Sequence, residues 1–249
     1  MCGYENSLDK EDKICPRCGL MFDKWLKNRY KTKATSQHQQ ATSPVTPFLQ
    51  IVKNKLLFVP ENFSKSRFYL NVAIYSLFFT WGWSFILSNH YSAELNNSFM
   101  HVINLVFHEA GHVIFRLLGQ FMSILGGSLL QLLVPLIFLF SFLLRKDTFA
   151  ASIMLWWFAQ SMMDLVAYID DAQRQEMWLL GGVQGKDLPG IHDWNNILSQ
   201  LGLLKYDHLL ATLVSWLAIF IMLLAFYWGA VLLIKMKKST CVTSSKYLI

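Results

Sequence analysis

The stretch FHEAGHVIF (residues 107–115) places two histidines and a glutamate inside an apolar segment. On a helix, His108 and His112 are four residues apart and share a face, so both can bind one metal ion. Glu109 lies about 100° round the helix axis, within reach of a water on that metal. The spacing therefore predicts a zinc site with Glu109 as general base.

The same helical face continues backward through Asn104 to His101, which makes a polar stripe on an apolar helix. Such groups are costly in lipid, so they normally face the interior of a helix bundle or a wet cavity. We therefore expect the stripe to be buried against other helices. A hydrogen-bonded polar cluster without metal is the structural alternative.

The composition around this stretch is that of a membrane protein. Hydrophobic residues make up 54% of the 249 residues and charged residues 15%, against roughly 25% charged in soluble chains. Residues 1–67 hold 12 Lys/Arg and 6 Asp/Glu, and this difference of +6 equals the net charge of the whole chain. A basic N-terminal segment before apolar stretches is typical of a cytoplasmic flank, and it argues against nucleic-acid binding.

Five apolar stretches approach the roughly 20 residues that a helix needs to cross a bilayer. They cover about 68–88, 101–119, 122–144, 148–169 and 209–234. We expect an all-α polytopic membrane protein with four to five membrane helices, one of them carrying HExxH. If every basic cluster lies on the cytoplasmic side, four stretches cross fully and the HEAGH stretch is shallow or returns to the side it entered.

The remaining segments divide the chain into four regions. Residues 67–235 form the predicted membrane metallohydrolase-like domain, 27–66 a flexible basic linker, and 236–249 a tail. Residues 1–26 are similar to the short zinc ribbons at the N-termini of many bacterial membrane proteins, because ICPRCG (14–19) is a zinc knuckle and MCGY resembles the end of another. Cys2, Cys15 and Cys18 are the candidate ligands of this second zinc; the fourth ligand, and whether the knuckle binds metal, stay open. We expect a multi-pass protein of the bacterial inner membrane with a cytoplasmic N-terminus.

A catalytic zinc needs a third protein ligand and an open position. Asp164 is the deepest carboxylate of the stretch WWFAQSMMDLVAYIDDAQ (156–173), and a ligand role would explain its place in an apolar span. The pair His192–Asp193 is the alternative, although Asp193 could instead cap a helix that begins at Trp194. Asp171 is a weaker candidate at the end of the span.

HEAGH in an apolar helix, followed by LGGSLLQLLVP (125–135) and a later intramembrane aspartate, resembles the site-2 protease class of intramembrane zinc metalloproteases. The resemblance covers residues 101–171. It implies His108 and His112 as zinc ligands, Glu109 as general base and Asp164 as third ligand. It also places the stretch from Gly126 to Gln131 where that family binds substrate.

The function expected from these features is hydrolysis of a membrane-embedded or juxtamembrane peptide by zinc-activated water. Gln131, Gln160 and His192 are candidate groups for binding substrate or the oxyanion. The expected partners are membrane lipid, a membrane protein or peptide substrate, and a cytoplasmic partner of the N-terminal segment. Two alternatives stay open: a non-catalytic zinc-binding membrane protein that acts as sensor or scaffold, and a zinc hydrolase of a non-peptide substrate.

Overall fold

The computed structural model describes residues 48–60, 63–91 and 98–245. The chain divides into two units, Met1–Ile51 and Val52–Ile249, and only residues 48–51 of the first unit are described. The predicted zinc ribbon with Cys2, Cys15 and Cys18 therefore lies outside the described residues. The HEAGH motif and all the apolar stretches belong to the second unit.

The described chain is mostly helical, as the sequence predicted. Its elements are α2 (Phe48–Leu56), α3 (Lys65–Leu87), α4 (Phe99–Phe115), η2 (Arg116–Leu118), α5 (Gln120–Leu144), α6 (Thr148–Asp170), β1 (Trp178–Leu179), β2 (Val183–Gln184), α7 (Asp193–Gln200), η3 (Leu204–Tyr206) and α8 (Asp207–Ser245). Among the described residues, four helical stretches are long and apolar enough to cross a membrane: Lys65–Leu87, Gln120–Leu144, Thr148–Asp170 and Leu204–Ser239. Of the four to five membrane helices that the sequence predicts, the described residues thus contain four candidate spans.

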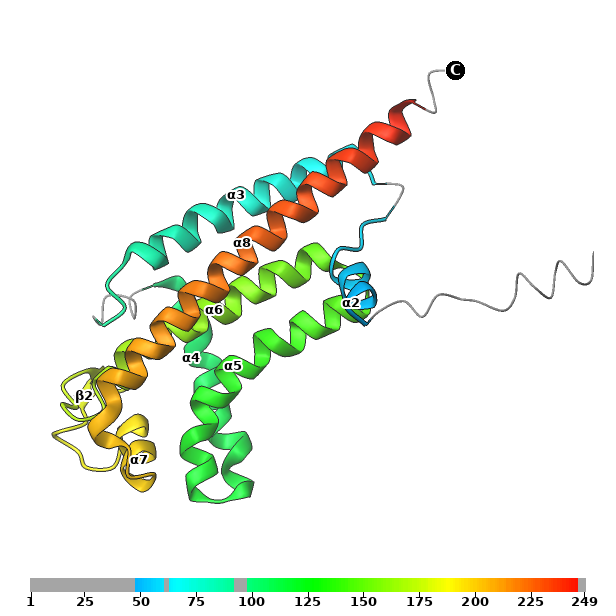
Figure 1. Ribbon diagram of the computed structural model, residues 1–249. Coiled ribbons are helices and arrows are strands. Elements are labelled where there is room, and N and C mark those ends of the chain that lie inside the picture. The colour runs from blue at the N-terminus through cyan, green and yellow to red at the C-terminus, as the bar shows by residue number, and fades with distance from the viewer. Residues whose placement is uncertain (1–47, 61–62, 92–97, 246–249) are drawn as a thin grey trace, which may run out of the picture. The chain divides into compact units, whose positions relative to one another are not determined.

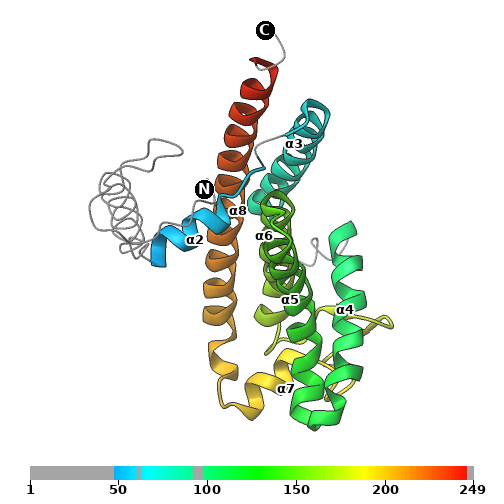
Figure 2. The same ribbon diagram turned by 90° about the vertical axis from the view of Figure 1, so that its right-hand side faces the viewer.

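The HEAGH helix α4 is shorter than these four, with 17 residues. It begins at Ser98, whose side chain accepts a hydrogen bond from the His101 amide and so caps the helix. It ends in the short helix η2, after which Gly119 adopts φ +101° and lets α5 begin in a new direction. As a result α4 and α5 lie side by side (Figures 1 and 2).

Helix α6 is the centre of the bundle and the most buried of the four long helices. It packs against α8 on one side and α5 on another, while α3 packs mainly on α8 (Figure 1). The largest core cluster gathers around Trp156 and Met163 of α6 and Met222 of α8, all nearly inaccessible to solvent. A helix buried on most of its surface explains why α6 has no single apolar face in its sequence.

The ends of the long helices that carry basic residues lie together. Arg67 at the start of α3 pairs with Asp147 before α6 at 3.3 Å, and Lys235 of α8 donates to the Leu57 carbonyl at 3.1 Å. Arg145 and Lys146 stand in the turn between α5 and α6. The basic clusters therefore share one end of the bundle, while α7 and the β1–β2 hairpin lie at the other (Figure 1).

Three segments differ from the sequence interpretation. Helix α2 lies within the predicted linker 27–66, and α8 runs through the predicted tail as far as Ser245. With 39 residues, α8 is far longer than the roughly 20 residues that a bilayer requires, so it extends beyond any single span. The hairpin in which Trp178 pairs with Gln184 and Leu179 with Val183 was not predicted, because its strands have only two residues each.

Two glycines bring α4 and α5 into backbone contact. A Cβ added to Gly111 would overlap the carbonyl of Gly126, and a Cβ on Gly126 would lie 2.6 Å from the Gly111 carbonyl oxygen. Gly111 therefore lets α5 approach α4 closely. Pairs of small residues serve this purpose in membrane helices, where tight van der Waals packing drives association.

We predict that Gly111→Ala destabilises the protein by about 1–3 kcal/mol, because the added methyl group meets backbone that cannot move aside. Thermal unfolding in detergent, followed by circular dichroism, measures the change. Val113→Ala on the exposed side of the same helix (72% exposed) is the control and should unfold close to the wild-type temperature. Equal midpoints for wild type and Gly111→Ala would show that the two helices are not held at this contact.

Candidate metal centre

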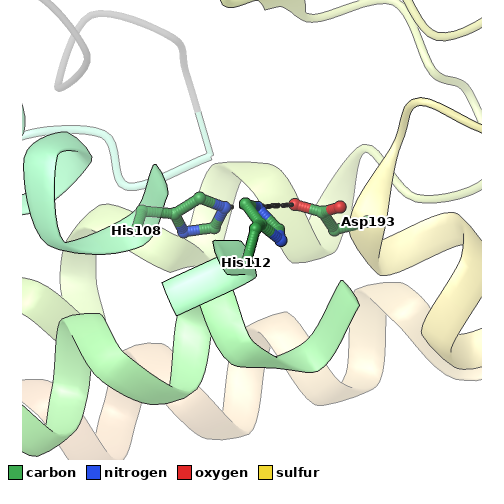
Figure 3. A group of neighbouring side chains, drawn as sticks. All are labelled: His108, His112 and Asp193. Carbon is green, nitrogen blue, oxygen red and sulfur yellow. Dashed lines mark hydrogen bonds and ion pairs between the residues drawn. The ribbon is translucent and has the colours of Figure 1, made fainter. Parts of the chain in front are cut away.

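Two elements distant in the sequence form the centre: the HEAGH motif of α4 and the first residue of α7. His108, His112 and Asp193 each present one ligand atom, and these atoms all lie within 4.8 Å of one another. The Asp193 Oδ2 atom is 3.1 Å from the Nε2 of His108 and 3.3 Å from the Nε2 of His112 (Figure 3). The predicted pair of histidines thus lies beside the carboxylate of Asp193 at the start of α7, and not beside a carboxylate of α6.

The other ring nitrogen of each histidine is already engaged. His112 Nδ1 donates to the Ser123 carbonyl at 2.8 Å, since a carbonyl oxygen can only accept. His108 Nδ1 is 3.1 Å from Gln131 Oε1. The Gln131 amide is oriented by its Nε2, which donates to the Asp164 carboxylate and the Ser161 carbonyl. Both rings therefore carry a proton on Nδ1.

The Nε2 atoms of both rings and the Asp193 carboxylate therefore face one another. Such an arrangement needs a cation between the three groups, either a proton or a metal ion. The separations of 3.1 and 3.3 Å match the distance of about 3.3 Å between two ligands of a tetrahedral zinc ion with bonds of about 2.0–2.1 Å. Two imidazoles and one carboxylate are a donor set that zinc accepts, so these residues fit a divalent metal.

Asp193 is held in place by the protein around it. Burial raises the pKa of its carboxyl group, but the hydrogen bonds and charges of His108 and His112 outweigh burial and lower that pKa to about 2. The Tyr168 hydroxyl of α6 accepts from the Asp193 amide at 2.9 Å and donates to its Oδ2 at 3.2 Å. The carboxylate is therefore ionised and positioned before any ligand binds.

Gly127 makes room for the two imidazoles. A Cβ at this position of α5 would lie 2.6 Å from the Nε2 atoms of both His108 and His112. Any larger residue would thus occupy the space in which the ligand nitrogens lie. The GG pair of the LGGSLLQLLVP stretch therefore has two roles: Gly126 permits helix contact and Gly127 leaves room for the two imidazole rings.

Asp164 lies deeper in the bundle and joins a different set of partners. Its carboxylate accepts from His101 Nδ1 at 2.9 Å, from Asn104 Nδ2 at 3.2 Å and from Gln131 Nε2 at 3.2 Å. The sequence favoured Asp164 as the third ligand, but the structure places Asp193, and not Asp164, beside His108 and His112. Through Gln131 it instead supports the ring of His108.

The stripe of polar residues on α4 is buried as expected. Asn104 is 1% exposed and donates to Gln160 and Asp164, while its Oδ1 accepts from Trp157 Nε1 and Ser161 Oγ. Every polar group of this side chain therefore has a partner on α6. These bonds fix the rotation of α4 about its axis and hence the direction of the two histidines.

A cavity of about 400 Å³ opens onto the centre. His101, His108, Glu109, His112, Gln131, Asp164, Tyr168 and Asp193 line it together with apolar side chains of residues 177–191. Glu109 is exposed to this space and stands next to the ligand pair in the sequence. A substrate in the cavity would thus meet the predicted base and the metal ligands together.

The other predicted site residues are placed as follows. Gln131 lines the cavity, but Gln160 and His192 are fully buried and do not. His192, and not Asp193, caps α7, because its Nδ1 accepts from the Asn195 amide at 3.2 Å. Asp171 accepts from the amides of Glu176 and Met177 and so fixes the start of the following loop.

Two contributions were missed by sequence reasoning. Tyr168 shares a helical face with Asp164, and this spacing could have marked it as a site residue, but no role was predicted for it. The β1–β2 hairpin lines the cavity through Trp178, Leu179 and Val183, and no periodicity marks so short a pair of strands. In comparisons with protein-family models, with curated proteins and with solved structures, no match to this chain was found.

The identity of the third ligand can be tested with a pair of isosteric variants. In a chain whose Cys2, Cys15 and Cys18 are replaced by serine, Asp193→Asn should lose stoichiometric zinc, because it removes the carboxylate between the two Nε2 atoms. Asp164→Asn should keep one zinc per chain, with affinity weakened by about 10- to 100-fold at most, the usual effect of a supporting residue. Zinc content after detergent purification and a competition titration measure both; the reverse ranking would make Asp164 the ligand.

We also predict that Gln131→Leu weakens zinc binding by about 10- to 100-fold, because the His108 ring loses the acceptor that sets its protonation and orientation. Gln120→Leu, at the exposed start of the same helix, is the matched control and should bind zinc as the wild type does. Indistinguishable affinities for Gln131→Leu and the wild type would remove Gln131 from the site.

Proposed function

We propose that the chain is a zinc-dependent membrane metallohydrolase that cleaves a membrane-embedded or juxtamembrane peptide. One observation carries the proposal: His108, His112 and Asp193 converge on one point of a cavity that Glu109 also lines. The resemblance of HEAGH and the later apolar stretch to site-2 proteases supports the same reaction. In this proposal Asp193 takes the ligand role that the resemblance assigns to Asp164.

Zinc held by these three residues would leave one position open and would lower the pKa of a bound water to about 7. Glu109 accepts a proton from the attacking water and delivers it to the leaving amine. Gln131 and Tyr168 keep His108 and Asp193 in place, so that no ligand has to reorganise during turnover.

The walls of the cavity favour an apolar, extended substrate. Trp178, Leu180 and Leu188 line it and are 67%, 65% and 51% exposed. Such exposed apolar side chains in a loop are stable at a membrane surface, where Trp in particular is favoured. A peptide leaving or entering the bilayer would meet this surface before it reached the metal centre.

Four apolar helices are compatible with a membrane protein, and the grouping of basic residues at one end suggests its orientation. By the positive-inside bias that end would face the cytoplasm, here proposed to be that of a bacterium, with the metal centre toward the opposite side. The N-terminal zinc ribbon stays a prediction, as does a partner for it.

The test of the reaction is Glu109→Gln, which removes the base and retains the shape of the side chain. We expect this variant to keep one zinc and to lose cleavage of a library of single-span membrane peptides by at least about 100-fold. Glu176→Gln is the matched control, since Glu176 is exposed and does not line the cavity.

Mass spectrometry of the products separates the alternatives. Peptide cleavage by Glu109→Gln at the wild-type rate would refute the mechanism. Zinc binding with no peptide product would support a sensor or scaffold, and cleavage of added lipid in place of peptide would support the non-peptide hydrolase.

A further inference from the structure

A second cavity lies at the basic end of the bundle, away from the metal centre. Its volume is about 330 Å³, and it is lined by Phe58, Pro60 and Phe63 together with the first turns of α3 and α6, the turn after α5 and the last part of α8. The two cavities lie at different positions along α5: Gln131 in the middle of this helix lines the first, and Arg145, just beyond its end, lines the second.

The charge of this cavity is positive. Arg67, Arg145 and Lys146 line it against a single carboxylate, Asp147, which gives three positive charges and one negative, a net of +2. Asp147 is already paired with Arg67 at 3.3 Å. The cationic groups of Arg67 and Lys146 also stand 5.5 Å from the rings of Phe63 and Phe58, respectively. An anion would thus meet two cationic groups that lie over aromatic rings of the cavity wall.

The walls are fixed before any ligand arrives. Thr148 Oγ1 donates to the Phe58 carbonyl at 2.7 Å, and Lys235 Nζ donates to the Leu57 carbonyl at 3.1 Å. Trp228 Nε1 donates to the neighbouring carbonyl of Leu56 at 2.8 Å. The backbone of residues 56–58 is therefore held to α6 and α8 by side chains of those two helices.

Asn71 of α3 adds an unusual polar group to the wall. It is 8% exposed and lines the cavity, and its amide Nδ2 donates to the Met236 sulfur at 3.5 Å. A thioether is a weak acceptor, so a buried amide gains free energy if a ligand offers it an oxygen. The cavity therefore combines cations with a buried donor that is poorly satisfied.

We propose that this cavity binds the phosphate headgroup of an anionic phospholipid. It lies at the ends of four helices that are apolar enough to cross a membrane, which is the level of the headgroups. Basic pockets between helices at this level bind anionic headgroups. Free phosphate has the same charge chemistry, but the apolar walls of Phe63, Phe149 and Met236 suit the glycerol and upper acyl chain of a lipid.

Native mass spectrometry of the full chain in detergent, titrated with phosphatidylglycerol or phosphatidylcholine, tests the proposal. We expect one phosphatidylglycerol per chain, bound at least fivefold more weakly by the double variant Arg145→Gln/Lys146→Gln. The control, Lys186→Gln/Lys205→Gln, loses the same charge outside this cavity and should bind as the wild type does. Asn71→Leu removes the buried amide donor without a change of charge and should also weaken binding.

Each outcome decides the matter. Equal binding of phosphatidylglycerol by the wild type and both cavity variants, or equal binding of the two lipids, would overturn the proposal. Displacement of the lipid by an equimolar amount of inorganic phosphate would assign the cavity to a free anion instead. Circular dichroism of each variant confirms that a loss of binding is not a loss of the fold.

Discussion

The polar face of α4 can be buried in an apolar bundle only where its hydrogen-bonding groups find partners, and the arrangement of the neighbouring helices follows from this constraint. Asn104 bonds only to α6, His108 bonds to α5 and α7, and His112 bonds to the start of α5. Because an unsatisfied polar group costs several kcal/mol in hydrocarbon, these bonds determine the rotation and depth of α4. The direction of the two histidines toward Asp193 thus follows from the hydrogen bonds that bury the polar face of α4.

The two carboxylates near the histidines, Asp193 and Asp164, have different partners. Asp193 faces both Nε2 atoms, whereas Asp164 receives hydrogen bonds from His101, Asn104 and Gln131 and acts on His108 only through the last of these. A ring that donates from Nδ1 to a fixed acceptor presents a more basic Nε2. The network around Asp164 therefore orients His108 through Gln131, and the carboxylate of Asp193 at the start of α7 completes the proposed ligand set.

The sequence was informative where the pattern was local. The spacing of His108, Glu109 and His112 defines a helical face, the long apolar stretches predict the four long helices, and the polar stripe predicts burial. The choice between Asp164 and Asp193 depends on contacts between residues that are far apart in the sequence. The depth of Asp164 in an apolar span favoured it as the third ligand. The groups that donate hydrogen bonds to Asp164 come from α4 and α5, and no sequence pattern shows that they contact it. Asp193 follows a loop and hairpin too short to show periodicity, so its approach to α4 could not be derived.

The central claim is that His108, His112 and Asp193 hold one zinc ion. X-ray absorption at the zinc edge tests it most directly, on the full chain with Cys2, Cys15 and Cys18 replaced by serine, so that the N-terminal cysteines cannot contribute. The account predicts one zinc per chain with a shell of nitrogen and oxygen at about 2.0–2.1 Å, two of the ligands showing imidazole scattering. A chain that holds no zinc, or zinc without imidazole ligands, would contradict it.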